Sequence, residues 1–242
     1  MRTRRDDDNP GSDAGLQGRL TARPTLPTDR GLAGSSGLQP LGLGTGSDRD
    51  GLWYVPSGYR ADRPAPLILM LHGAGGAARS GLAPFLSLAD AAGAILLAPD
   101  SRGRTWDVIL DEYGPDGVFI NAALTQTFAR YAIDAAHIAA EGFSDGASYA
   151  LSLGLMNGDL FTHVIAFSPG FATPATRQGM PRLFVSHGTR DAVLPIDRCS
   201  RRIVPQFERA GYDVRYTEFD GPHIVPPEIA SDSLAWFLGE SV

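Results

Sequence analysis

The sequence predicts a single α/β domain built on a mostly parallel, twisted sheet with helices on both faces. Short apolar runs such as Pro66–Leu71 and Ala94–Ala98 have the length of strands that are buried on both faces. These runs alternate with helix-length segments, the order typical of a parallel sheet. A chain of 242 residues with 43% hydrophobic and 20% charged residues is large enough for one domain with a sizeable core.

The N-terminal part differs in composition from the rest. Residues 1–16 are charged and poor in large apolar side chains, so we predict a disordered tail followed by a catalytic domain over 17–242. The Gly- and Pro-rich stretch from Leu20 to Gly46 has room for an edge strand or two. Asp48-x-Asp50-Gly51 is similar to the start of a calcium loop, but Tyr59 stands where the distal Glu is required. We therefore interpret it as a turn before a strand.

The remaining elements are predicted from apolar patterning and boundary residues. In order they are a strand Leu52–Val55, a strand Pro66–Leu71, a helix Ser80–Ala92, a strand Ala94–Ala98, a helix Asp116–Tyr131, a strand starting near His137, a helix from Ala147 to about Asn157, strands His163–Phe167 and Arg182–Ser186, a largely helical segment Pro195–Ala210, a strand Asp213–Phe219 and a helix Pro227–Leu238. Only a short loop fits between Phe167 and Arg182, so no large lid is predicted.

Charge and composition exclude several functions. The net charge of −6 argues against nucleic acid as a main partner. All 21 basic residues are arginine, which rules out a Schiff-base lysine, a Ser-Lys dyad and a Walker lysine. Cys199 is the single cysteine, so no intramolecular disulfide can form, and we interpret it as structural. Acidic residues follow Arg4-Arg5 where a signal needs an apolar segment, and no 18-residue apolar run exists. We expect a cytoplasmic protein without a membrane span.

The motif Gly142-Phe143-Ser144-Asp145-Gly146 lies between a strand-like and a helix-like segment. A G-x-S-x-G sequence in this context is the nucleophile elbow of α/β-hydrolases, in which a tight, strained turn holds the serine hydroxyl clear of the sheet. The motif by itself is common in a Gly- and Ser-rich chain. The prediction of Ser144 as a nucleophile therefore depends on its partners.

Two further residues complete a catalytic triad. Ligands of doubly wound sheets bind beyond the carboxyl ends of the strands, and Ser144, Asp191 and His223 all follow predicted strands. Serine becomes nucleophilic when an imidazole takes its proton, and a buried carboxylate orients that imidazole. The order Ser, Asp, His is that of α/β-hydrolases.

Other histidines and acids are less suited to these two positions. His137 and His163 begin strands at the opposite end of the sheet, and His72 is expected to stabilise its own loop by a hydrogen bond. His187 is the rival base, although it lies close to its own strand. Asp197, in or beside a helix, and Asp220 are weaker alternatives to Asp191.

The loop Leu71-His72-Gly73-Ala74-Gly75-Gly76 follows the first buried strand and is predicted to supply part of an oxyanion hole. The amides of Ala74 and Asp145 would then stabilise the tetrahedral oxyanion. The Asp145 side chain is interpreted as a favourable charge at a helix N-terminus. A rival interpretation is a dinucleotide fingerprint, because Gly73-x-Gly75-x-x-Ala78 follows a strand and Asp100 ends the next one. That interpretation leaves Ser144, Asp191 and His223 without a role.

From about Gly51 to the C-terminus, the chain resembles α/β-hydrolase esterases of the phospholipase/carboxylesterase group and their polyhydroxybutyrate-depolymerase-like relatives. The resemblance is carried by the loop 71–76, the elbow, His223, and the segments Pro99-Asp100-Ser101-Arg102-Gly103-x-Thr105-Trp106-Asp107 and His187-Gly188-Thr189-Arg190-Asp191. In such enzymes the segment around Trp106 often lines the acyl pocket, so the resemblance implies Trp106 as a wall, with a core tryptophan as the alternative. Ser168 and Phe171, after a strand end, and Phe143, in the elbow, are further candidates for substrate contacts.

Two departures from this resemblance limit it. Secreted depolymerases usually carry a signal and disulfides, so a solid polymer is not the expected substrate. Dienelactone hydrolases have cysteine at the elbow, where this chain has Ser144.

The sequence thus predicts a serine carboxylesterase for small soluble acyl esters, acting through an acyl-enzyme without metal or cofactor. An acyl thioesterase or lysophospholipase with the same triad is the alternative. A serine peptidase ranks lower because no propeller or cap domain is predicted, and a non-catalytic binding module ranks lower because all three triad residues are present. Oligomeric state, acyl chain length and the alcohol group are left open.

Overall fold

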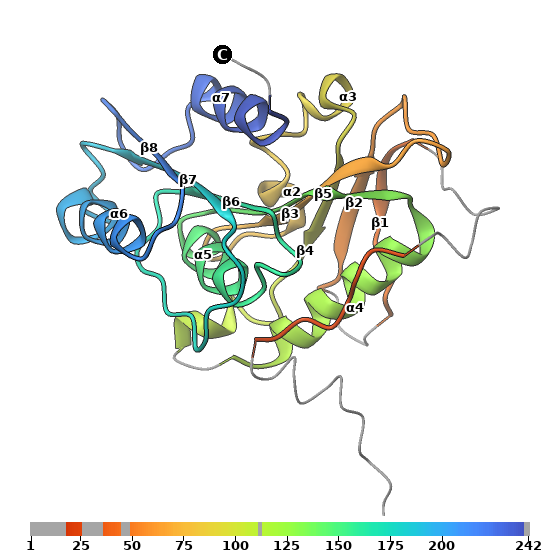
Figure 1. Ribbon diagram of the computed structural model, residues 1–242, viewed down its shortest axis with the longest axis horizontal. Coiled ribbons are helices and arrows are strands. Elements are labelled where there is room, and N and C mark those ends of the chain that lie inside the picture. The colour runs from red at the N-terminus through yellow and green to blue at the C-terminus, as the bar shows by residue number, and fades with distance from the viewer. Residues whose placement is uncertain (1–17, 26–35, 45–48, 111–112, 240–242) are drawn as a thin grey trace, which may run out of the picture.

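The computed structural model describes residues 18–25, 36–44, 49–110 and 113–239. Over these residues the chain forms one eight-stranded sheet in the order β1-β2-β4-β3-β5-β6-β7-β8 (Figure 1). The strands are β1 Gly37–Pro40, β2 Gly51–Val55, β3 Ala65–Leu71, β4 Ile95–Pro99, β5 Ile133–Phe143, β6 His163–Phe167, β7 Arg182–Gly188 and β8 Val214–Phe219. β2 runs antiparallel to β1 and β4, and every pairing from β4 to β8 is parallel. The predicted mostly parallel sheet is confirmed.

Helices cover both faces of the sheet (Figure 1). Helices α4 (Pro115–Arg130), α5 (Asp145–Met156) and α6 (Ser200–Arg209) contribute to the core on one face. Helices α2 (Ala78–Gly81), α3 (Ala89–Ala92) and α7 (Pro227–Phe237) contribute to the core on the other. Two short 3₁₀ helices, η1 (Asp107–Leu110) and η2 (Ile196–Arg198), complete the set. None of the described helices is long and apolar enough to cross a membrane.

Burial on both faces explains the apolar composition of the central strands. Every residue of β4 and β6 is buried, and β3 is buried at all but one position. Side chains alternate between the two cores, so Leu69 and Leu71 of β3 face one core while Ile68 and Met70 face the other. A strand in this position needs apolar residues throughout, which is why no polar alternation is visible in the sequence.

Several predicted boundaries differ from the structure. The predicted helix Ser80–Ala92 is two short helices, α2 and α3, joined by turns. Pro84 lies in the connection and has no backbone N–H to continue a helix. The segment Pro195–Ala210 divides into η2 and α6 at Cys199, whose φ of −113° and ψ of −107° are not helical. β5 begins at Ile133, four residues before the predicted start, because its first residue pairs with Ala65 across a register shift.

The N-terminal predictions are answered only in part. The disordered tail over residues 1–16 and Asp48 of the calcium-like loop lie outside the described residues. The edge strand expected between Leu20 and Gly46 is β1. The loop between β6 and β7, residues 168–181, contains no helix, in agreement with the prediction that no large lid is inserted there.

Candidate active site

Ser144 occupies the sharp turn between β5 and α5. Its φ of 58° and ψ of −120° are a strained combination for a residue with a side chain. The turn is tight because Gly142 and Gly146 let backbones meet: a Cβ on Gly146 would collide with the carbonyl oxygen of Leu71, and one on Gly142 with that of Gly146. Although Ser144 is the N-cap of α5, its hydroxyl makes no capping hydrogen bond and is available to another partner.

That partner is His223, in the loop between β8 and α7. The Nε2 atom of His223 lies 2.9 Å from the Oγ atom of Ser144, and its Nδ1 atom lies 2.5 Å from the Oδ2 atom of Asp191. Asp191 comes from the loop after β7. The three side chains predicted from separate loops are therefore joined in one chain of hydrogen bonds, because those loops follow parallel strands at the same edge of the sheet.

The carboxylate of Asp191 is held on both oxygens. Its Oδ1 atom accepts hydrogen bonds from the amides of Val193 (2.9 Å) and Leu194 (2.8 Å), while Oδ2 faces His223. Burial raises the pKa of Asp191, but the hydrogen bonds from His223, Leu194 and Val193 outweigh it and hold the pKa below its usual value. Asp191 is therefore ionised at neutral pH, and a fixed carboxylate orients the imidazole with Nε2 toward the serine.

The predicted oxyanion donors lie on two elements beside Ser144. Asp145 is the first residue of α5, and a first-turn amide has no acceptor within its own helix. Ala74 lies in the loop after β3, and no acceptor in the described part of the chain pairs with its amide. Gly73, its neighbour, is close to the elbow: a Cβ there would lie 3.5 Å from the Cβ of Ser144. Both amides thus belong to segments that lie next to Ser144.

The loop after β4 holds the loop after β3 in position. His72 accepts a hydrogen bond from the Ser101 amide at Nε2 (3.1 Å), and its Nδ1 atom lies 2.8 Å from the Gly73 carbonyl. The amide of Gly75 donates to the carbonyl of Arg104 (2.7 Å). Burial lowers the pKa of His72, so the ring is neutral and supports the loop, as expected from its position.

Thr105 ties the loop after β4 to the elbow. Its Oγ1 atom donates to the Oδ2 atom of Asp145 at 2.6 Å. The Asp145 side chain is therefore anchored at the start of α5. Thr105 belongs to the motif 99–107, but nothing in that motif indicates this hydrogen bond.

The other histidines and acids lie elsewhere. His163 is buried against Trp236 and Phe237, and its burial lowers its pKa to about 4. His137 pairs with Asp134 at 2.6 Å. The alternative acids form surface ion pairs, Asp197 with Arg201 (2.8 Å) and Asp220 with Arg190 (2.9 Å). His187 contacts Asp191 from inside the protein and makes no hydrogen bond to Ser144.

The features that the dinucleotide interpretation requires are not present among the residues that the structure describes. The Oδ1 and Oδ2 atoms of Asp100 accept the backbone amides of Ala78 (2.6 Å) and Asp50 (3.1 Å), so this carboxylate is not free for a ribose hydroxyl. Helix α2 is only four residues long, whereas the fingerprint opens a full helix.

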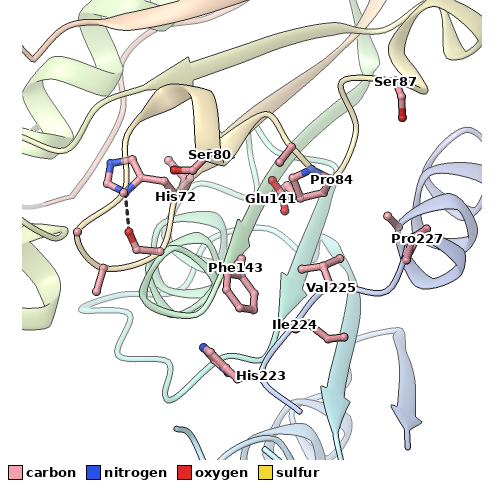
Figure 2. Close-up of a pocket in the computed structure, with 18 residues that line it drawn as sticks. His72, Ser80, Pro84, Ser87, Glu141, Phe143, His223, Ile224, Val225 and Pro227 are labelled. Atoms are coloured by element: carbon pink, nitrogen blue, oxygen red, sulfur yellow. Dashed lines mark hydrogen bonds between the residues drawn. The ribbon is translucent and has the colours of Figure 1, made fainter. Parts of the chain in front are cut away.

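A cavity of about 610 Å³ opens beside His223 (Figure 2). Its walls come from the loop after β3, the α2–α3 segment, the end of β5 and the chain entering α7. The lining is mainly apolar and includes Phe143, whose ring centroid is 4.6 Å from that of His223. The labelled lining residues are His72, Ser80, Pro84, Ser87, Glu141, Phe143, His223, Ile224, Val225 and Pro227.

Three of the four predicted substrate contacts are not placed at this cavity. Trp106 is 0% exposed; its Nε1 atom donates to the carbonyl of His72, and its ring stacks on Tyr149. Ser168 is also fully buried at the end of β6. Phe171 packs against the core on the α5 side of the sheet, opposite the cavity. Only Phe143 lines it, because residues 141 and 143 of β5 point to the α7 side.

Three residues that were not predicted as substrate contacts also line the cavity: Glu141, Ile224 and Val225. Glu141 can be recognised in the sequence, because a carboxyl group is unusual in an apolar strand that is buried on both faces. Ile224 and Val225 follow His223 directly, and nothing in their spacing indicates that this loop turns toward the cavity.

No protein-family model matches the chain. The chain is 31% identical over 159 residues to a probable feruloyl esterase C from Aspergillus flavus, covering 62% of this chain and 58% of the relative. It is 30% identical over 172 residues to feruloyl esterase C from Emericella nidulans, covering 66% and 63%. The chain thus spans less than two thirds of these relatives.

Solved structures are similar over more of the chain. The structure of esterase PE8 has a TM-score of 0.64 at 22% identity and covers 78% of this chain and 98% of that one. A CE1 ferulic acid esterase from Anaeromyces mucronatus, in complex with ferulic acid, has a TM-score of 0.61 at 20% identity and covers 81% and 87%. At this level of identity the similarity establishes the architecture. The protein has the predicted α/β-hydrolase fold.

Proposed function

We propose that the protein is a serine-dependent carboxylic-ester hydrolase that acts through an acyl-enzyme intermediate. The observation that carries the proposal is the continuous hydrogen-bonded chain from Ser144 through His223 to Asp191, beside an open cavity. The similarity to proteins named esterases supports it. Within this class we favour the phospholipase/carboxylesterase group.

The proposed mechanism uses this chain as a proton relay. The Nε2 atom of His223 takes the proton of Ser144 as Oγ attacks the ester carbonyl carbon. The amides of Ala74 and Asp145 stabilise the oxyanion that forms, at roughly 3–4 kcal/mol per donor. His223 then gives its proton to the departing alcohol, leaving an ester between Ser144 and the acyl group. A water molecule, deprotonated by His223, attacks this ester, and the proton returns to Ser144 as the acid leaves.

The proposed substrates are small soluble acyl esters. The described residues place no helix in the loop between β6 and β7, so the site is open to solvent-borne substrate. Since the curated relatives are named feruloyl esterases, methyl ferulate belongs in any substrate panel. A thioesterase or lysophospholipase with the same triad is the alternative within this mechanism, and turnover of acyl-CoA or lysophosphatidylcholine would distinguish it.

The decisive experiment is the hydrolysis of p-nitrophenyl esters from acetate to palmitate by wild type, Ser144→Ala and Ser231→Ala. Ser231 is exposed on α7, so its variant controls for the same chemical change. We expect turnover by wild type and Ser231→Ala, and a loss of about 10⁴-fold or more in Ser144→Ala. A fluorophosphonate should label wild type stoichiometrically. Activity that survives in Ser144→Ala would overturn the mechanism, and a folded wild type that neither turns over esters nor reacts with the fluorophosphonate would favour a non-catalytic binding module.

A further inference from the structure

Glu141 is an acidic residue in the apolar interior of the sheet. It lies on β5, three residues before Ser144, and is 1% exposed. The sheet register places Met70 of β3 and Ile165 of β6 directly beside it. On the same face of β5, Ala139 is part of an apolar core and Phe143 packs against that core. Nothing in these surroundings stabilises a buried carboxylate.

The carboxyl group of Glu141 has no hydrogen-bond partner. Neither Oε1 nor Oε2 has one in the part of the chain that the structure describes. Burial raises the pKa of Glu141 well above its ordinary value, which favours the neutral acid, and a neutral carboxyl has one O–H donor and free acceptor sites. An unsatisfied buried polar group costs about 1–3 kcal/mol, so its presence asks for an explanation.

The cavity beside the triad offers an explanation for this unsatisfied carboxyl group. Glu141 lines this cavity together with His223 and Phe143. In the view of Figure 2, Phe143 lies between His223 and Glu141, and Pro84 and Val225 belong to the same lining. Three strand residues span about 10 Å, so an acyl group attached at Ser144 is of the right order of length to reach Glu141.

The other polar groups of this lining are less suited to hold a ligand. The Oγ atom of Ser80 donates to the carbonyl of Ala77 and accepts its amide, and Ser87 is exposed. Ile224, Val225 and Ala230 are apolar, and the lining contains no arginine. A hydroxyl group therefore suits this end of the cavity better than a charged group does, because it can donate to and accept from a neutral carboxyl without bringing a charge into an apolar site.

We propose that Glu141 is a specificity-determining residue that binds a hydroxyl group on the acyl part of the substrate, so that the enzyme prefers esters of hydroxylated acids. This inference rests on the proposed esterase function and names the substrate class of the same site. The hydroxyl group of the substrate forms hydrogen bonds with the carboxyl group of Glu141. An ester that lacks this hydroxyl leaves the carboxyl group without a partner.

The test compares methyl esters that differ only in one hydroxyl group. The pairs are ω-hydroxy and plain fatty acids of four to ten carbons, and 4-hydroxycinnamate with cinnamate. The readout is the ratio of kcat/KM within each pair, measured for wild type, Glu141→Leu and Glu141→Gln. A ratio cancels any general loss of activity or stability, which a merely structural role for Glu141 would cause.

We expect wild type to favour the hydroxylated ester by about tenfold or more in at least one pair. Glu141→Leu should bring that ratio to about one, and Glu141→Gln should keep part of it because an amide also donates and accepts. If Glu141→Leu does not fold, Glu141→Met takes its place. Wild type without a preference in any pair, or a folded apolar variant with the wild-type ratio, would overturn the inference.

A binding measurement separates this inference from the proposed function. The affinity of Ser144→Ala for the same ester pairs, measured by calorimetry, does not require turnover. If wild type hydrolyses no ester and Ser144→Ala still prefers the hydroxylated ligand, with the preference lost in Ser144→Ala/Glu141→Leu, the Glu141 subsite stands while the esterase proposal fails. If Ser144→Ala shows no such preference either, both fail.

Discussion

His187 places its Nε2 atom 3.2 Å from the Oδ2 atom of Asp191, the same oxygen that Nδ1 of His223 approaches at 2.5 Å. The ring of His187 is completely buried, with the carbonyl of Leu194 2.7 Å from Nε2 and the hydroxyl of Ser200 2.7 Å from Nδ1. Burial lowers the pKa of His187, so a neutral ring donates from Nε2. His187 thus helps to hold the Asp191 carboxylate in place, and His223 faces Ser144.

This arrangement predicts unequal effects for the two histidines. In His187→Gln, an amide can still donate toward Leu194 and Asp191, so we expect kcat to fall by no more than about tenfold. In His223→Gln, the serine loses its base, and kcat should fall by about 10⁴-fold. The measurement is kcat for p-nitrophenyl butyrate at pH 8. Equal losses in the two variants would show that His187 takes part in proton transfer.

The sequence predicts for a topological reason that Ser144, Asp191 and His223 lie close together, and in the structure hydrogen bonds join them. Ser144, Asp191 and His223 all follow strands, and the carboxyl ends of parallel strands meet at one edge whatever the detailed packing. The prediction that these three loops meet needs only the order of the strands and not the directions of the side chains. The same argument locates Ala74 in the loop after β3.

Side-chain direction in irregular segments was not predictable in this way. Trp106 follows β4 by several residues, and its indole turns into the core because the carbonyl of His72 and the ring of Tyr149 are there to receive it. Both partners are distant in sequence. Glu141 shows the opposite case: its place in a central strand predicts burial, but no residue near it in the sequence indicates what would satisfy its carboxyl group.

The hydrogen bond from Thr105 to Asp145 predicts an effect on catalysis. Thr105→Val keeps the shape of the side chain and removes the donor, so the loop after β4 loses its link to the start of α5. We expect kcat to fall about tenfold with little change in KM, because the oxyanion donors are needed most in the transition state. Thr125→Val is the matched control, since Thr125 bonds only to the Asn121 carbonyl on the exposed side of α4. A loss in KM alone would place Thr105 in substrate binding.

The tight turn at Ser144 predicts that the stability of the protein depends strongly on Gly146. An alanine Cβ at this position would collide with the backbone of Leu71, which cannot move without displacing the end of β3. We expect Gly146→Ala to lower the free energy of unfolding by about 3 kcal/mol or more in urea titrations. A Cβ at Gly58 meets nothing within 4 Å, so Gly58→Ala should stay within about 0.5 kcal/mol of wild type. Similar stabilities for the two variants would contradict the close approach of β3 and α5.

The buried carboxyl of Glu141 predicts how stability depends on pH. Its pKa in the folded protein is raised above the ordinary value of 4.5 by burial, so above pH 4.5 the unfolded chain releases a proton that the folded protein retains. The group therefore lowers the stability of the folded protein least below pH 4.5, where the unfolded chain also holds the proton. As pH rises from there toward the raised pKa of the folded state, stability is lost at up to about 1.4 kcal/mol per pH unit.

Glu141→Gln isolates this effect, because an amide is buried at the same place and does not titrate. We expect the free energy of unfolding of wild type, measured against that of Glu141→Gln by urea titration from pH 4 to pH 8, to fall as the pH rises. Glu141→Met, which removes the unsatisfied oxygens, should be more stable than wild type at pH 7 by about 1–3 kcal/mol. A pH-independent difference between wild type and Glu141→Gln would show that Glu141 ionises as readily in the folded protein as in the unfolded chain. A stabilised Glu141→Met that no longer favours hydroxylated esters would instead show that the acid is kept at a cost in stability, because substrate selection needs it.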